Sequence, residues 1–251
     1  METAISGGRN TLAPNTFMRP RSLADQAADQ IRHRIVKGDF QLGEALSETT
    51  LAADLGVSKT PIREAFLRLK TEGLVDIQPQ RGTFVFRMSA AEVHTLSEFR
   101  DVLETSALHV AMRADAPALA RALEGSVADM ERALAREDPI GYREHDGLFH
   151  KCIIDHCGNA YLSEAFAMIA FRIQTLRNRL SLDPALNVRS FREHRTLTRM
   201  IGQGLEAKAI AFLQRHIATT TDDYEQTTAA AGEECDATRR GGRSRSAAGA
   251  E

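Results

Sequence analysis

Apolar side chains recur along the chain at two kinds of spacing, and the change between them divides the chain near residue 87. Before that point, apolar positions one helical turn apart predict short helices, and one stretch of alternating apolar residues predicts a β-hairpin. After it, helical periodicity continues to about residue 225 with few breaks. The pattern predicts a mainly α protein with two domains, residues 19–87 and 88–225.

The first domain contains two short helices joined by a tight turn. Ser47 and Ser58 are suited to begin these helices, and Gly56 is suited to close the first, because such a turn often needs a positive φ. A longer helix, SLADQAADQIRHRIVK, precedes them and ends at Gly38. Two short helices around a turn that contains glycine are typical of a helix-turn-helix.

A β-hairpin is predicted directly after these helices, in LVDIQPQRGTFVF. Residues 74–77 form its first strand, residues 78–82 the turn and residues 83–86 the return strand. A hairpin in this place is a wing, so the first domain is predicted to be a winged helix-turn-helix. A small α+β packing module that does not bind DNA is the alternative.

The second helix of such a pair enters the major groove with its N-terminal residues. Hydroxyls and backbone N–H groups at a helix start suit phosphate oxygens, and the planar fork of Arg63 suits the O6 and N7 atoms of guanine. At the wing tip, Gly82 lets the backbone approach DNA closely. Arg34, near the end of the first helix, is a weaker candidate. The predicted DNA-binding residues are Arg34, Ser58, Lys59, Thr60, Pro61, Arg63, Arg81 and Gly82.

The second domain is predicted to be an antiparallel all-helical bundle, because its six helices are joined by short breaks. The helices are placed at residues 90–114, 116–136, 138–157, 160–182, 187–202 and 205–225.

Four side chains of this bundle are candidate metal ligands. Asp146 and His150 are four residues apart and so share one helix face. His194 and His216 each lie beside apolar residues on later helices, which indicates that they face inward. A carboxylate with imidazoles suits Zn²⁺, Mn²⁺, Ni²⁺ or Fe²⁺. The alternative is that these histidines are core residues, each bonded to a neighbour.

Composition predicts where the protein is located and which segments of the chain are disordered. The apolar fraction of 43% and the net charge of −2 fit a soluble globular protein, and the charge does not exclude a local basic face. The three cysteines match neither a disulfide framework nor a CxxC motif. Since the sequence shows no apolar span and no signal peptide, we expect a cytoplasmic protein. Residues 1–18 and 226–251, rich in small and polar side chains, are predicted to be a disordered arm and tail.

The stretch from Gly43 to Val85 closely resembles the N-terminal domain of GntR-family bacterial transcription regulators. The pieces SKTPIREA, LRLKTEGLV and RGTFV occur in the family's order and spacing. The resemblance implies binding to a double-stranded DNA operator through Ser58, Lys59, Thr60, Arg63 and Gly82. A position that often carries a DNA-contacting arginine in the family is Thr49 here. An operator-reading domain this small usually needs a partner, so we expect a homodimer.

The second domain looks like the all-helical FCD ligand-binding domain of the FadR-type branch, in its shorter, VanR-like form with six helices. The segments HDGLFHKCIIDHCGN, REHRTLTRMI and LQRHI carry this resemblance. It implies a divalent metal, commonly zinc, held by Asp146, His150, His194 and His216, and a small organic-acid effector whose carboxylate reaches the metal.

Three further residues are candidate effector contacts. Arg100 resembles an arginine found near the ligand in this branch, and an ion pair with Glu104 is its alternative role. Arg172 and Asn178 are predicted to line the same cavity.

The sequence therefore predicts a DNA-binding transcription regulator and not an enzyme, with repression relieved by ligand as the expected mode. Two alternatives remain: a regulator whose metal is purely structural, and a metal-dependent hydrolase, for which no general base is evident.

Overall fold

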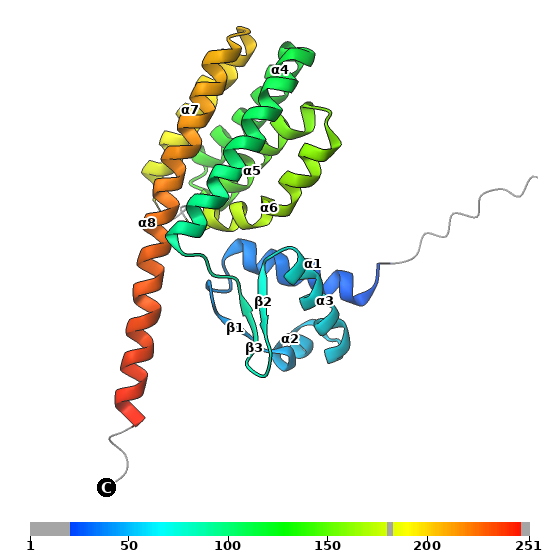
Figure 1. Ribbon diagram of the computed structural model, residues 1–251, viewed down its shortest axis with the longest axis vertical. Coiled ribbons are helices and arrows are strands. Elements are labelled where there is room, and N and C mark those ends of the chain that lie inside the picture. The colour runs from blue at the N-terminus through cyan, green and yellow to red at the C-terminus, as the bar shows by residue number, and fades with distance from the viewer. Residues whose placement is uncertain (1–20, 180–182, 247–251) are drawn as a thin grey trace, which may run out of the picture.

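The computed structural model describes residues 21–179 and 183–246, with side chains described as far as Gln226. It confirms the predicted fold class: a winged helix-turn-helix lies at one end of an all-helical bundle (Figure 1). The predicted arm, residues 1–18, lies outside the described residues. Within the described chain, none of the helices is long and apolar enough to cross a membrane.

Local sequence signals determine where the helices of the winged domain begin and end. Ser22 and Asp25 form a reciprocal capping box at the first helix, which ends at Gly38 with φ of 99°. Gly56 closes the second helix with φ of 66°, a conformation that favours glycine. The helices are α1 (Leu23–Lys37), α2 (Glu48–Leu55) and α3 (Lys59–Thr71).

Three short strands complete this domain, and the central one belongs to the wing. The order is β1-β3-β2, with antiparallel pairing throughout. Ile62 and Phe66 of α3 are buried with Val85 of β3 in one apolar core, so the core holds α3 against the wing. The strands are β1 (Ala45–Leu46), β2 (Val75–Gln78) and β3 (Gly82–Val85).

In the described part of the chain the bundle contains five helical elements, and the first covers two predicted helices. That element is kinked at Asp115, which has the non-helical angles φ −161° and ψ 82°. The Asp115 carboxylate accepts a hydrogen bond from the Ala118 backbone N–H at 2.8 Å, and Pro117 has no N–H to donate. The kink therefore lies where the sequence predicted a break. The helices are α4 (Ala90–Ala135), α5 (Pro139–His156), α6 (Ala160–Arg179), α7 (Pro184–Gly202) and α8 (Glu206–Ser246).

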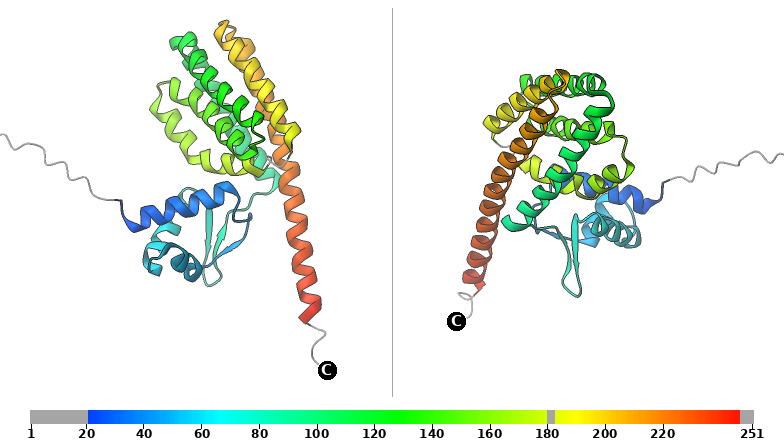
Figure 2. Two further views of the ribbon diagram at one scale, coloured as in Figure 1. Left: turned by 180° about the vertical axis from the view of Figure 1, so that it is seen from behind. Right: turned by 45° about the horizontal axis from the view of Figure 1, so that its top comes forward.

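Helix α8 continues beyond residue 225, where a disordered tail was predicted, and extends past the bundle (Figure 2). The prediction was wrong for the backbone of residues 226–246. It relied on the small and polar composition of the stretch, whereas its alanine and glutamate residues have high helix propensity. Residues 247–251 lie outside the described part.

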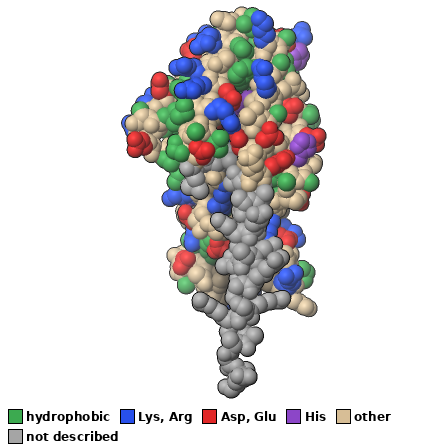
Figure 3. All heavy atoms as spheres, turned by 90° about the vertical axis from the view of Figure 1, so that its left-hand side faces the viewer, with side chains coloured by type: hydrophobic (Ala, Val, Ile, Leu, Met, Phe, Trp, Pro, Cys, Tyr) green, Lys and Arg blue, Asp and Glu red, His purple; other side chains and the backbone are tan. Residues whose placement is uncertain are grey.

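The described surface of the bundle mixes both signs of charge. Figure 3 shows acidic and basic side chains interspersed over one face, in keeping with the net charge of −2. This face therefore carries no field of a single sign.

We predict that Phe66→Ala lowers the free energy of unfolding of the winged domain by about 3–5 kcal/mol, because it empties a buried site in the core. Phe66 is 2% exposed, whereas its neighbour Leu67 on the same helix is 61% exposed. Urea denaturation checks this. Leu67→Ala is the matched control and should change stability by no more than about 0.5 kcal/mol. Equal effects of the two substitutions would contradict this account of the core.

Candidate metal centre and DNA-binding surface

Three histidines from different helices converge in the bundle interior. One ring nitrogen from each of His150 (α5), His194 (α7) and His216 (α8) lies within 4.8 Å of the other two. All three side chains are buried. The Nε2 atoms of His150 and His194 are 3.2 Å apart, close to the spacing of about 3.4 Å between two nitrogens that share a tetrahedral zinc.

Carboxylates orient two of these rings. The Nδ1 atom of His150 lies 2.5 Å from Glu104 Oε2, and the Nδ1 atom of His216 lies 2.6 Å from Glu193 Oε2. Because a carboxylate only accepts, each Nδ1 carries the proton and each Nε2 keeps its lone pair. A carboxylate behind a ligating histidine is the usual second layer of a metal site. The donor chemistry of the cluster therefore fits a divalent transition metal.

Burial keeps two of the imidazoles, those of His150 and His194, neutral. It lowers the pKa of His150 well below its usual range and lowers the pKa of His194 to about 3. At neutral pH these rings are in the uncharged form that binds metal ions.

Asp146 lies at the edge of the cluster. Its Oδ1 accepts a hydrogen bond from Ser190 Oγ at 3.0 Å and is 3.7 Å from His194 Nδ1. Its Oδ2 pairs with Arg177 Nε at 2.6 Å. Although burial raises the pKa of this carboxyl, the charge of Arg177 lowers it on balance. Asp146 is thus a buried, ionised carboxylate already held by α6.

Arg100 lies beside the histidines and also pairs with Glu104, so the two roles considered for it occur together. Its Nε donates to Glu104 Oε1 at 2.6 Å, and one terminal nitrogen is 3.0 Å from His150 Nε2. Its other terminal nitrogen has no hydrogen-bond partner among the described residues. A fixed guanidinium with an available donor suits an anion.

Arg172 and Asn178 are placed at the boundary between the domains, and their bonds cross it. Arg172 Nε donates to the backbone oxygen of Gly73 at 3.0 Å. Asn178 Nδ2 donates to the backbone oxygen of Val36 at 2.6 Å. The structure does not bring either side chain to the three histidines as an effector contact, because each projects from α6 toward the winged domain.

Sequence reasoning missed Glu104, Glu193 and Arg177 as members of the centre. A signal for Arg177 was present, since it continues the four-residue series of Ile169 and Ile173 on the buried face of α6. A charged side chain at an apolar position is rarely buried without a partner. No local signal identified that partner as Asp146.

The predicted DNA-binding residues of the recognition helix are presented to solvent. Ser58, Lys59 and Thr60 are exposed at the start of α3. Ser58 occupies the N-cap without using its hydroxyl for capping, which leaves that hydroxyl for a phosphate. Arg63, 64% exposed, donates from Nε to Glu48 Oε2 at 2.8 Å, a surface pair that DNA can displace.

The other candidates differ in accessibility. Arg81 and Gly82 are exposed at the wing tip, where Gly82 has φ of 111°. Pro61 is half-buried. Arg34 is engaged within its own domain, because it pairs with Asp54 at 3.4 Å and lies over the ring of Phe40.

An exposed recognition helix with a wing, joined to a bundle that encloses a histidine cluster, defines a DNA-binding regulator with an attached helical domain. The chain belongs to the GntR family of bacterial regulators and carries an FCD domain. Residues 23–85 match the model of bacterial regulatory proteins of the gntR family, and residues 95–219 match the FCD domain.

Curated relatives support this assignment. The gluconate operon transcriptional repressor of Bacillus licheniformis is 28% identical, over 63% of this chain and 65% of its own length. The Nta operon transcriptional regulator of Aminobacter aminovorans is 30% identical, over 71% of this chain and 83% of its own length. These proteins are regulators, which confirms the prediction that the chain is not an enzyme.

Solved structures share the fold. A GntR regulator from Rhodococcus sp. RHA1 superposes with a TM-score of 0.72 at 22% identity, covering 81% of this chain and 98% of that one. At this identity the likeness concerns the architecture alone.

We predict that Glu193→Gln weakens Zn²⁺ binding about 10–100-fold, because the His216 ring loses the charged acceptor that orients it. Competition with a chromogenic zinc chelator measures the affinity. Glu144→Gln is the matched control, since Glu144 is an exposed residue on α5 and should bind zinc as the unaltered protein does. Unchanged affinity in Glu193→Gln would argue against this carboxylate as a support of a metal ligand.

Proposed function

We propose that this protein is a transcriptional repressor whose operator affinity is controlled by a small organic acid bound beside a divalent metal in the bundle. One observation carries the proposal: three buried histidines, two of them backed by carboxylates, adjoin an Arg100 nitrogen without a hydrogen-bond partner in the described chain. A metal-binding donor set next to a fixed cation matches the chemistry of a metal-bound carboxylate.

Zinc is the metal that this donor set suits best, with Ni²⁺, Mn²⁺ and Fe²⁺ as alternatives. His150, His194 and His216 supply three nitrogens, and Asp146 is the fourth proposed ligand. A bound zinc would supply a Lewis-acidic position for an effector oxygen.

Arg100 is the proposed anchor of the effector carboxylate. Its charge is secure, because the buried Glu104 raises its pKa above the usual value despite the opposing effect of burial. The nitrogen without a partner is a ready donor to a carboxylate. Since two Bacillus relatives are named gluconate operon transcriptional repressors, sugar acids belong among the candidate ligands.

DNA recognition is proposed to use a homodimer on a two-fold symmetric operator. Lys59 and the N-terminal hydroxyls of α3 contact phosphates, Arg63 reads a guanine, and Arg81 with Gly82 contacts the adjacent backbone or minor groove. The effector acts only as far as it binds the DNA-competent and DNA-incompetent states with different affinity.

We expect Arg63→Ala to weaken binding to an operator selected from a random DNA pool by about 5–150-fold, corresponding to about 1–3 kcal/mol. Fluorescence anisotropy measures the change. Arg132→Ala, which removes an exposed arginine of the bundle, is the matched control and should leave affinity unchanged. Full operator affinity in Arg63→Ala would refute the proposed base contact.

A thermal-shift screen of zinc-loaded protein against small organic and sugar acids tests the sensing role. We expect one class of acid to raise Tm through binding linkage, and His194→Ala to abolish the rise. If operator affinity and Tm ignore every acid, the metal is structural and the organic-acid proposal is wrong.

A further inference from the structure

Two faces of helix α6 make different contacts, because side chains point around a helix at successive positions. One face is buried in the bundle and ends at Arg177, whose Nε is 2.6 Å from Asp146 Oδ2. The other faces the winged domain and lies along α1 (Figures 1 and 2). The same rigid element therefore touches the histidine centre and the DNA-binding domain.

The last turn of α6 docks on the end of α1. Asn178 Nδ2 donates to the Val36 oxygen at 2.6 Å, and Arg179 donates to the Phe40 oxygen at 2.7 Å. About two helical turns before Asn178, the ring of Phe171 lies under the guanidinium of Arg32, whose central carbon is 5.0 Å from the ring centre. These contacts hold the segment that leads from α1 into the sheet.

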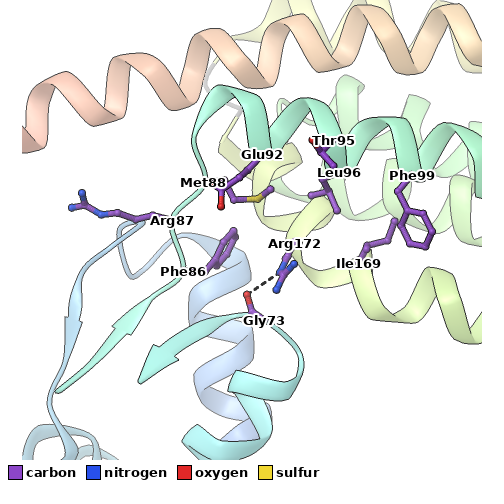
Figure 4. A pocket seen from close by; sticks show the side chains of 10 residues that line it. All are labelled: Gly73, Phe86, Arg87, Met88, Glu92, Thr95, Leu96, Phe99, Ile169 and Arg172. Atoms are coloured by element: carbon purple, nitrogen blue, oxygen red, sulfur yellow. Dashed lines mark hydrogen bonds between the residues drawn. The ribbon is translucent and has the colours of Figure 1, made fainter. Parts of the chain in front are cut away.

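A second docking point lies at Gly73, at the end of the recognition helix. Gly73 has φ of +68°, and a Cβ there would lie 1.6 Å from an Arg172 nitrogen, so the guanidinium fills the place of a side chain. A cavity of about 470 Å³ adjoins this contact, lined by Phe86 of the winged domain, Met88 of the connection and Leu96 of α4 (Figure 4). The domains thus meet through a few polar bonds beside open space, which leaves room for displacement.

Arg177, Asn178 and Arg179 are consecutive, so no flexible segment separates the centre from the docking contacts. Arg177 and Asp146 are both almost fully buried, and each is the other's close ion-pair partner. A buried guanidinium that loses its carboxylate is costly, and the surrounding structure must rearrange or supply another anion.

We infer that the last turn of α6 couples occupancy of the histidine centre to docking of the winged domain, with Arg177 as the positioning residue that reads the charge at Asp146. A cation among the histidines competes with Arg177 for that carboxylate. Displacement of Arg177 then moves the donors of Asn178 and Arg179 away from Val36 and Phe40. This inference rests on the proposed metal site but names a route that the site alone does not require.

Hydrogen exchange of the full-length chain, with Zn²⁺ as the probe, tests the coupling. We expect zinc to change exchange in the peptide spanning residues 34–42 at least 3-fold in the unaltered protein. Arg179→Ala, outside the histidine centre, should still bind zinc yet lose most of this response, and Arg177→Lys, which keeps the charge but not the geometry, should lose the response as well. Arg132→Ala, on an exposed site of the bundle, should respond as the unaltered protein does.

Linkage gives a second readout that does not depend on exchange. If docking and zinc binding are coupled, Arg179→Ala must also shift the zinc dissociation constant, by about the same factor with which zinc shifts docking. A purely structural Arg179, with no contact to the histidines, would leave the zinc constant unchanged.

The outcomes separate the two proposals. If zinc binds with the affinity of a specific site but leaves residues 34–42 unaffected, or affects the unaltered protein and both α6 variants equally, the coupling is wrong and the metal centre stands. If no divalent ion binds the unaltered chain in the chelator competition, the metal centre and the coupling both fail.

Discussion

Arg177 and Asp146 form an ion pair whose two side chains are each only 3% exposed, inside a bundle with a large apolar core. A charge inside a protein is tolerated only when an opposite charge or hydrogen bonds replace its hydration. The Arg100–Glu104 pair meets the same requirement close by, with side chains 1% and 0% exposed. The two pairs fix where a polar centre can exist in this core, and the histidines lie between them.

All five helical elements of the bundle contribute to this centre. Arg100 and Glu104 come from α4, Asp146 and His150 from α5, Arg177 from α6, His194 from α7 and His216 from α8. A ligand that contacts this centre therefore acts on every helix of the domain at once. Ligand and metal sites in helical bundles are commonly built in this way, from side chains on facing helices.

Local features could be predicted from the sequence, and long-range pairings could not. Gly38, Gly56 and the caps at Ser22 and Ser47 set helix ends through interactions a few residues long, so the winged domain was predictable almost in full. Repeats of four residues likewise indicated that Asp146 and His150 share a face.

The unpredicted contacts join residues far apart in the chain. The pairing of Glu104 with His150 spans 46 positions, and the bond from Asn178 to Val36 spans 142. A helical pattern states that a side chain is buried but not which element buries it. That is why Arg172 and Asn178 were expected at the effector cavity and lie instead at the domain boundary.

The docking bonds from α6 have one property in common: they end on backbone carbonyl oxygens, those of Val36, Phe40 and Gly73. Every residue type presents such an oxygen, so these contacts place few demands on the side chains of the winged domain. The DNA-facing side chains can change, and with them the sequence that is read, while the attachment to the bundle persists. Evolution can therefore combine one helical domain with winged domains of different DNA specificity, provided that the position of Gly73 stays without a side chain.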